Sequence, residues 1–206
     1  MKSFFKEAFR TIKTSGTIRP SSNRLVQNCL KGLDFDGAKT VFEFGPGDGC
    51  FTKKILDNLN DDAKLISLEI NQNFYQHCIE KFSTNKTVKF VKKSALDFDK
   101  ELSTLATRNI DIIISSLPLS LLEDSEVDEL MNKVYKHLKD GGMFVQYQYS
   151  LGKHSKLKEI FDRVDVSLTI QNLPPAFVYK CHKFGKTLSA NSLDLNQEFK
   201  LDDMGV

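Results

Sequence analysis

The stretch V-F-E-F-G-P-G-D-G-C-F-T, Val41 to Thr52, places three glycines directly after a short apolar run that reads as a strand. Gly45, Gly47 and Gly49 precede a helical pattern that begins at Phe51. Glycine lets the backbone turn tightly and approach a ligand, because no Cβ stands in the way. A strand, a glycine-rich turn and a helix in this order predict a ligand-binding loop in an α/β fold.

The residues around these glycines narrow the choice of ligand. A dinucleotide fingerprint has the spacing G-x-G-x-x-G, whereas here Cys50 occupies the place of the third glycine. Glu43 precedes the loop, and its carboxylate would repel a pyrophosphate but suit an ammonium or a sulfonium. Glu69 ends the next strand-like run, where an acid accepts hydrogen bonds from the two ribose hydroxyls of a nucleoside. The pattern therefore indicates a nucleoside that carries positive charge.

Strand-like and helix-like stretches alternate along the chain, which predicts an α/β fold with a mostly parallel sheet. The segment Asn172–Ala176 leaves no room for a crossover helix, so the last two strands should pair antiparallel. We expect a doubly wound sheet of seven strands, the first five parallel, with a closing antiparallel hairpin. The expected strands are Thr40–Phe44, Lys64–Ile70, Val88–Val91, Asp111–Ser115, Met143–Tyr149, Val164–Ile170 and Phe177–His182. The expected helices are Phe51–Leu59, Asn73–Phe82, Lys100–Ala106 and Ser125–Leu138, the last of them stopped by Gly141 and Gly142.

Charge is concentrated at the start of the chain. Residues 1–33 hold seven basic side chains and one acidic one, a net charge of +6 in a chain whose total is +2. Apolar residues recur there at helical spacing, which predicts either an amphipathic helix on an anionic surface or a helix packed on the sheet. We expect a basic helical arm over residues 1–35, a ligand-binding domain over 36–186 and a polar tail over 187–206. The apolar residues at this helical spacing are Phe4, Phe5, Ala8, Phe9 and Ile12.

The remaining composition excludes several classes of protein. The four cysteines are scattered without a C-x-x-C pair, so we expect neither a disulfide framework nor a metal site, and a cytoplasmic location. No apolar run approaches the ~20 residues that span a bilayer, and no signal peptide is recognisable.

The glycine loop, E-x-G-x-G-x-G, and the acid after the second strand resemble those of class I S-adenosylmethionine-dependent methyltransferases, over roughly Thr40 to His182. The resemblance implies a Rossmann-like fold with S-adenosylmethionine as cofactor. Ser94 stands where many such enzymes have an Asp that binds the adenine amino group. The implied cofactor-binding residues are Ser21, Glu43, Gly45, Gly47, Gly49, Glu69, Ser94, Ala95 and Ser115.

The loop after the expected fourth strand, S-S-L-P-L from Ser115 to Leu119, bears on the methyl acceptor. The rRNA adenine dimethylases have Asn-Leu-Pro-Tyr there, so Ser116 replaces the amide and Leu119 the base-stacking aromatic. With G-T-I-R-P-S-S-N-R-L (16–25), V-Q-Y-Q-Y (145–149) and N-L-P-P-A-F-V-Y (172–179), the loop resembles that of soluble bacterial phospholipid N-methyltransferases. These enzymes methylate phosphatidylethanolamine, so the resemblance implies a phospholipid acceptor and a protein bound peripherally to the inner face of the membrane. We also expect the protein to be a monomer.

The same resemblance places part of this loop and the end of the fifth strand beside the transferable methyl. The implied catalytic residues are Ser115, Ser116, Leu117, Pro118 and Tyr147. Leu117, Leu119, Leu121 and Leu122 are expected to form an apolar mouth for lipid, or in part to cap the core. Tyr147, Tyr149 and Tyr179 are expected near the acceptor, and His154 is a candidate base.

Three alternatives stay open at this point. The fold and the basic arm also fit an RNA adenine N-methyltransferase, a small-molecule methyltransferase, or a non-catalytic module that kept a nucleoside pocket. The missing aromatic after Pro118 weighs against the first, and the intact glycine loop weighs against the last.

Overall fold

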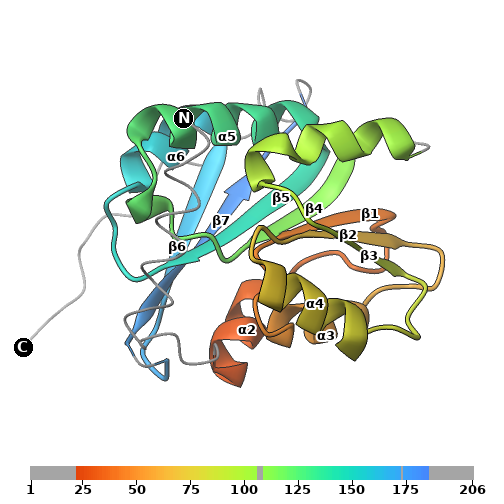
Figure 1. The fold of residues 1–206 in the computed structure, drawn as a ribbon. Helices are drawn as coiled ribbons and strands as arrows, with labels where there is room; N and C mark the ends of the chain where they lie inside the picture. Colours follow the sequence, from red (N-terminus) through yellow and green to blue (C-terminus); the bar gives the residue numbers. More distant parts are fainter. Residues whose placement is uncertain (1–21, 106–108, 173, 186–206) are drawn as a thin grey trace, which may run out of the picture.

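A seven-stranded sheet forms the centre of the protein in a computed structural model, with helices on both of its faces (Figure 1). The structure describes residues 22–105, 109–172 and 174–185. Most of the predicted arm, up to residue 21, and the predicted tail lie outside the described residues.

The strand order is β3-β2-β1-β4-β5-β7-β6. β1 to β5 pair in parallel, and β7 runs antiparallel to both β5 and β6. The predicted fold class is therefore confirmed, including the closing hairpin. The strands are β1 Thr40–Phe44, β2 Lys64–Leu68, β3 Val88–Val91, β4 Ile110–Ser115, β5 Leu138–Gln148, β6 Arg163–Thr169 and β7 Ala176–His182.

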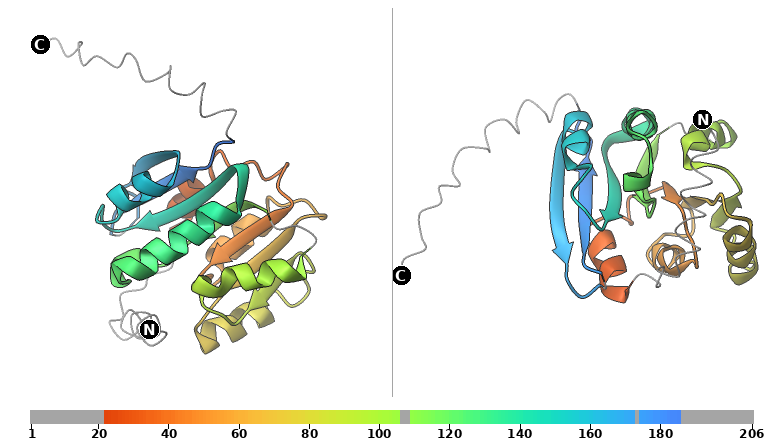
Figure 2. Two further views of the ribbon diagram at one scale, coloured as in Figure 1. Left: turned by 90° about the horizontal axis from the view of Figure 1, so that it is seen from above. Right: turned by 60° about the vertical axis from the view of Figure 1, so that its left-hand side comes forward.

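Two layers of helices cover the sheet, as the two views of Figure 2 also show. One layer contains α2 (Asn23–Leu30), α3 (Cys50–Leu56) and α4 (Gln72–Lys81). The other contains the 3₁₀ helix η1 (Ala95–Thr104) together with α5 (Asp124–His137) and α6 (His154–Ile160). A short 3₁₀ turn, η2 (Leu119–Leu121), joins β4 to α5.

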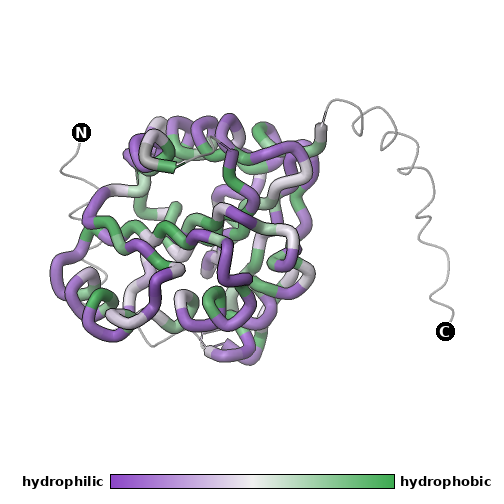
Figure 3. The backbone as a smooth tube through the Cα atoms, turned by 90° about the vertical axis from the view of Figure 1, so that its right-hand side faces the viewer, coloured by the Kyte–Doolittle hydropathy of each residue, from purple (hydrophilic) through white to green (hydrophobic). Residues whose placement is uncertain are grey.

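The central strands are buried on both faces, which explains their continuous apolar sequence. All five residues of β1 are buried, as expected for a parallel strand covered by helices on both sides. Figure 3 shows the apolar residues concentrated along the strands and the hydrophilic ones on the surrounding helices and loops. The sheet therefore separates two apolar cores, one under each helical layer.

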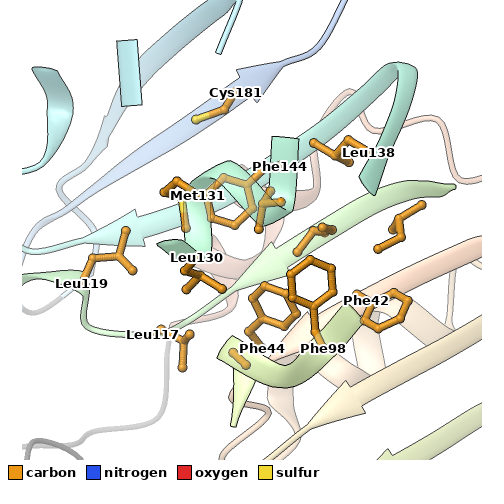
Figure 4. Packing of buried hydrophobic residues seen from close by; sticks show 14 of the residues in the cluster. Phe42, Phe44, Phe98, Leu117, Leu119, Leu130, Met131, Leu138, Phe144 and Cys181 are labelled. Carbon is orange, nitrogen blue, oxygen red and sulfur yellow. The ribbon is translucent and has the colours of Figure 1, made fainter. Parts of the chain in front are cut away.

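The larger core lies between the sheet and η1, α5 and α6. Phe42, Phe44, Phe98 and Phe144 form its centre, with Phe42 and Phe98 in edge-to-face contact at 5.8 Å (Figure 4). The smaller core lies under α2 and α3, where Leu25, Val26 and Cys29 of α2 are fully or almost fully buried. The second half of the predicted arm thus contributes to this core.

The end of α5 and the start of β5 differ from the prediction. α5 ends at His137 and β5 begins immediately at Leu138, so the glycine pair does not stop the helix. Instead, the pairing with β4 jumps from Leu138 to Met143, a bulge in which Gly141 takes a left-handed φ of 82°. Glycine is needed here because a left-handed backbone strains other residues.

Two helical segments also differ from the prediction. The helix expected at Lys100–Ala106 is a 3₁₀ helix that begins five residues earlier, because the hydroxyl of Ser94 caps it by accepting a hydrogen bond from Leu96 N. The seven-residue helix α6 was not predicted. Leu157 is its only buried residue, so the segment has no apolar periodicity long enough to reveal a helix.

All four cysteines are free thiols. Among the described residues, no helix combines the length and apolarity that crossing a bilayer requires.

Candidate active site

The predicted functional residues gather at the carboxyl edge of the parallel strands. Glu43, Glu69 and Ser115 lie at or next to the ends of β1, β2 and β4, three neighbours in the sheet. Ligands of doubly wound sheets bind outside this edge, where the chain leaves the strands. The predicted cofactor residues of three separate segments are thus brought together.

The glycine loop between β1 and α3 depends on left-handed backbone conformations. Gly45, Gly47 and Gly49 have φ angles of 76°, 56° and 79°. A Cβ on Gly47 would meet nothing within 4 Å, whereas one on Gly49 would lie 2.6 Å from the ring of Phe82 at the end of α4. Gly47 therefore faces open space that a ligand can occupy, and Gly49 allows α4 to pack against the loop.

Glu69 ties the glycine loop to the end of β2. Its carboxylate accepts hydrogen bonds from Asn71 N at 2.7 Å and from Gly47 N at 3.3 Å, while its side chain is almost fully buried. A carboxylate has about four lone-pair sites, so a group of this type can also accept hydrogen bonds from the hydroxyls of a ligand. Ribose hydroxyls are donors of that kind.

Glu43 is a buried carboxyl group directly under the loop. Its Oε2 accepts hydrogen bonds from Thr52 Oγ1 at 2.8 Å and from Ser67 Oγ at 2.7 Å. Its Oε1 is buried and has no hydrogen-bond partner among the described residues. Burial raises the pKa of Glu43 to about 7, and the two hydroxyl bonds only partly oppose this shift. A neighbouring positive charge would stabilise its ionised form.

These observations fit the cofactor that the sequence predicts. The open space at Gly47 admits a bulky group, the Glu69 carboxylate provides acceptors, and the unpartnered Glu43 oxygen suits a cationic centre. The donor set contains oxygens but no cluster of metal ligands; among the described residues no three His, Cys, Asp or Glu side chains gather in a way that could hold a metal ion.

The two serines after β4 hold the adjacent loop in place. Ser116 donates its hydroxyl to the carbonyls of Phe44 and Gly45, and its backbone N–H also donates to Phe44 O at 3.0 Å. Ser115 Oγ accepts a hydrogen bond from Leu117 N at 3.3 Å. Both predicted serines are thus beside the glycine loop, but their hydroxyls already bond to main-chain groups.

The expected apolar mouth is mostly core. Leu117, Leu119 and Leu122 are buried in the larger core, where Figure 4 shows the first two near Leu130 of α5. Only Leu121 is exposed, to 41%. Three of the four leucines therefore cap the core, which is the alternative that the sequence left open, and Leu121 alone of the four is exposed.

The other residues implied for cofactor binding are Ser94, Ala95 and Ser21. Ser94 caps η1 after β3, and Ala95 is buried beneath the same turn. Both lie at the carboxyl edge, next to β2. Ser21 lies outside the described residues.

The aromatic residues expected near the acceptor divide between the two faces of the sheet. Tyr147 stacks on Phe51 of α3, with ring centroids 5.7 Å apart. Tyr179 is fully buried on the other face, and its hydroxyl donates to Ser150 O at 3.1 Å. His154 begins α6, and its ring lies 5.9 Å from that of Tyr179. Tyr149 is about half exposed.

Two glutamines at the end of β5 were not predicted as site residues. Gln146 and Gln148 are buried, and together they hold three amide atoms without a partner among the described residues. The alternation in V-Q-Y-Q-Y put amides on one face of an expected strand, and this signal could have pointed to them.

Comparison with known proteins agrees with this geometry. Residues 42–144 match the family model described as "Methyltransferase domain". The chain is 26% identical to an ornithine lipid N-methyltransferase of Singulisphaera acidiphila over 185 residues, which covers 88% of this chain and 96% of that protein. It is also 30% identical over 122 residues to ribosomal RNA small subunit methyltransferase A of Borreliella burgdorferi, covering 55% of this chain but only 41% of that protein.

Solved structures show the same fold. The N-methyltransferase NodS of Bradyrhizobium japonicum, in complex with S-adenosyl-l-homocysteine, superposes with a TM-score of 0.59 at 11% identity. The match covers 87% of this chain and 98% of NodS.

Proposed function

Because this chain belongs to the methyltransferase-domain family and is a class I S-adenosylmethionine-dependent methyltransferase, we propose that it methylates the amine of a lipid headgroup. Phosphatidylethanolamine, its methylated forms and ornithine lipid are the acceptors that fit this proposal. The cofactor would be held by the glycine loop and by Glu69 and Glu43.

The main observation in favour of a lipid acceptor is the position of the exposed apolar side chains. Among the described residues, the exposed large apolar side chains follow β4 or β5, lie within β6 or directly follow it. β6 and β5 both run antiparallel to β7 and are therefore parallel to each other, so their ends share the edge where the cofactor residues gather. The exposed residues are Leu121, Tyr149, Leu151, Val166, Leu168 and Ile170.

An apolar rim of this kind is unfavourable on a protein that meets only water. Ile170 is 69% exposed, and Leu168 about half exposed. Contiguous exposed apolar surface usually marks a contact with protein, ligand or membrane. Here the exposed apolar residues lie toward the edge of the sheet where the predicted cofactor residues gather, and acyl chains are the acceptor component that they suit. The relative from Singulisphaera acidiphila, matched over almost its full length, is named for a lipid acceptor and supports the same choice.

Bound S-adenosylmethionine supplies a methyl group on a positively charged sulfur. The chain's own residues would bind and orient the reactants: Gly47 leaves room for the cofactor, Glu69 accepts hydrogen bonds, and Glu43 favours a cation nearby. The loop from Ser116 to Pro118 would hold one side of the acceptor site, because Ser116 binds it to the glycine loop. Correct placement of two reactants is a large part of the rate in such transfers.

We also propose that the basic arm, residues 1–35, binds the protein to the membrane that contains the acceptor. Its apolar residues would enter the headgroup boundary of an anionic membrane, and its lysines and arginines would meet the phosphates. The protein would then be cytoplasmic and peripherally bound to the inner face of the membrane. The four basic residues of the arm's amphipathic segment are Lys2, Lys6, Arg10 and Lys13.

A methyl-transfer assay with labelled S-adenosylmethionine tests the proposal. Vesicles containing phosphatidylethanolamine, vesicles containing ornithine lipid, and RNA are offered in parallel. We expect label in one of the lipids. Label only in RNA would favour the adenine methyltransferase alternative, which the partial match to ribosomal RNA small subunit methyltransferase A raises. Label in none of the three would point to a small-molecule acceptor.

A further inference from the structure

The hydroxyls of the loop after β4 are already engaged with main-chain groups. Ser116 occupies the position where the resembling RNA enzymes carry an amide, and its hydroxyl donates to the carbonyls of Phe44 and Gly45. Ser115 Oγ accepts from Leu117 N. An amine that attacks a methyl group must be held with its lone pair aligned, and side-chain oxygens that accept its N–H groups can hold it in this way.

Gln146 provides one unused acceptor beside this loop. Gln146 of β5 is the register partner of Ser115 of β4, and its side chain is fully buried. Its Nε2 donates to Leu117 O at 2.8 Å and to Tyr147 O at 2.7 Å. Two carbonyls require a donor, which fixes the orientation of the amide and leaves Oε1 as the free end. This oxygen has no partner among the described residues.

Gln148 provides a second and wholly unused amide. It lies two residues further along β5, about 7 Å nearer the carboxyl edge, and its side chain is on the same face as that of Gln146. Gln148 is only 4% exposed, and neither Oε1 nor Nε2 has a partner among the described residues. A buried amide without hydrogen bonds destabilises the fold. A bound ligand that forms hydrogen bonds with the amide would explain why a Gln stands at this position.

The surroundings of Gln148 connect this amide to the apolar rim. Gln148 pairs with Phe177 of β7, and Phe177 pairs with Leu168 of β6. Directly paired residues project from the same face of a sheet, so Gln148, Phe177 and the exposed Leu168 form one row. The row leads from the unpartnered amide to the apolar rim at the edge of the sheet.

We infer that Gln146 and Gln148 form the polar half of the acceptor site, their amide oxygens receiving the N–H groups of the lipid amine. This inference rests on the proposed function. Neutral amides suit the task better than carboxylates, because a carboxylate would stabilise the protonated ammonium and raise its pKa. The Nε2 of Gln148 remains as a donor for an oxygen of the same headgroup, such as a phosphate or carboxylate oxygen.

A variant that keeps the shape but removes the amide tests the inference. Gln148→Met is compared with the wild type and with Gln27→Met, which removes an exposed amide from α2. Affinity for short-chain lipids is measured by calorimetry with S-adenosylhomocysteine present. The lipids are dihexanoyl phosphatidylethanolamine, a short-chain ornithine lipid, and the fully methylated counterpart of each, which has no N–H to donate. Methyl transfer to the first two is measured in parallel.

We expect Gln148→Met to weaken binding of the methylatable lipid, and to lower kcat/KM, by roughly tenfold. Binding of its fully methylated counterpart should change less than twofold, and so should the affinity for S-adenosylhomocysteine. The melting temperature should stay the same or rise, because the removed amide is unpartnered.

Equal losses for the methylatable and fully methylated lipids would overturn the inference, and so would no loss for either. A lowered melting temperature together with weaker S-adenosylhomocysteine binding would show instead a structural role for Gln148. These outcomes differ from failure of the proposed function, in which the wild type itself transfers no methyl group to any lipid.

Discussion

Replacing Glu43 with Gln should abolish a pH dependence of stability that the wild-type protein shows in the absence of ligand. Glu43 is fully buried, and burial raises its pKa to about 7 from an ordinary value of 4.5. A carboxyl group whose pKa is raised by folding contributes stability that is complete below the unfolded pKa. This contribution is lost as the pH rises through the folded pKa.

The size of the effect follows from the two pKa values. Between pH 4.5 and about 7 the folded protein keeps the Glu43 proton while the unfolded chain has lost it. The free energy of unfolding then falls by ~1.36 kcal/mol per pH unit. Ionised Glu43 thus destabilises the fold by about 3 kcal/mol at pH 8, and about 2.5 kcal/mol of this develops between pH 5 and pH 8.

Urea unfolding of the wild type and of Glu43→Gln at several pH values measures this difference. Gln keeps an oxygen for the hydroxyls of Thr52 and Ser67, and its amide nitrogen replaces the unpartnered Oε1. Any penalty for that nitrogen is independent of pH. Relative to wild type, the variant should therefore gain about 2.5 kcal/mol in free energy of unfolding from pH 5 to pH 8.

Glu101→Gln is a matched control. Glu101 is also buried, but hydrogen bonds from Lys93 and Lys89 outweigh the effect of burial and lower its pKa. Its titration lies below pH 4.5, so this variant should differ from wild type by a constant amount between pH 5 and pH 8. A constant difference for Glu43→Gln as well would refute a raised pKa for Glu43.

Three further predictions concern the cofactor, the rim and the arm. Glu69→Ala should weaken S-adenosylmethionine binding by ~1–3 kcal/mol, because ribose hydroxyls lose their acceptor; unchanged affinity in calorimetry would remove Glu69 from the ribose site. Leu121→Asp should lower lipid methylation in a folded protein with normal cofactor affinity, whereas Leu119→Asp buries a charge in the core and should unfold the protein in circular dichroism. Removing the four basic charges of the arm should weaken co-sedimentation with anionic vesicles by about 1 kcal/mol per charge at low salt and little at high salt. Vesicle binding like that of wild type, with a destabilised fold in Phe9→Asp, would instead indicate an arm packed on the body.

The fold and the gathering of the glycine loop, Glu43 and Glu69 at one edge of the sheet could be predicted from the sequence because both rest on local patterns. The glycine spacing, the position of Glu43 before the loop and the acid at Glu69 lie within one strand–loop–helix–strand unit. The short segment before β7 likewise required the closing hairpin. In each case the residues that decide the structure are neighbours in the chain.

The acceptor half depends on contacts between distant residues, which no local pattern records. The loop S-S-L-P-L reads as exposed because it follows a strand and contains Pro118, yet Leu117 and Leu119 are drawn under α5 by the core. The bulge at Gly141 arises only where β5 meets β4. Gln146 reads as one of two amides in an alternating strand, and only the hydrogen bond from its Nε2 to Leu117 O across the sheet shows how its amide is oriented.

The buried polar atoms that lack a partner among the described residues are not scattered through the protein. They belong to Glu43, Asp99, Gln146 and Gln148, and all but Asp99 lie near the carboxyl ends of β1 and β5, on the two sides of β4. Native proteins pair nearly all buried polar groups, and this chain does so through most of its core. Unpaired groups that collect on both sides of one strand end are better explained by ligands than by imperfect packing. Glu43 would then lie on the cofactor side of β4 and the two glutamines on the acceptor side, so that the two reactants would meet at the end of β4, beside its serines.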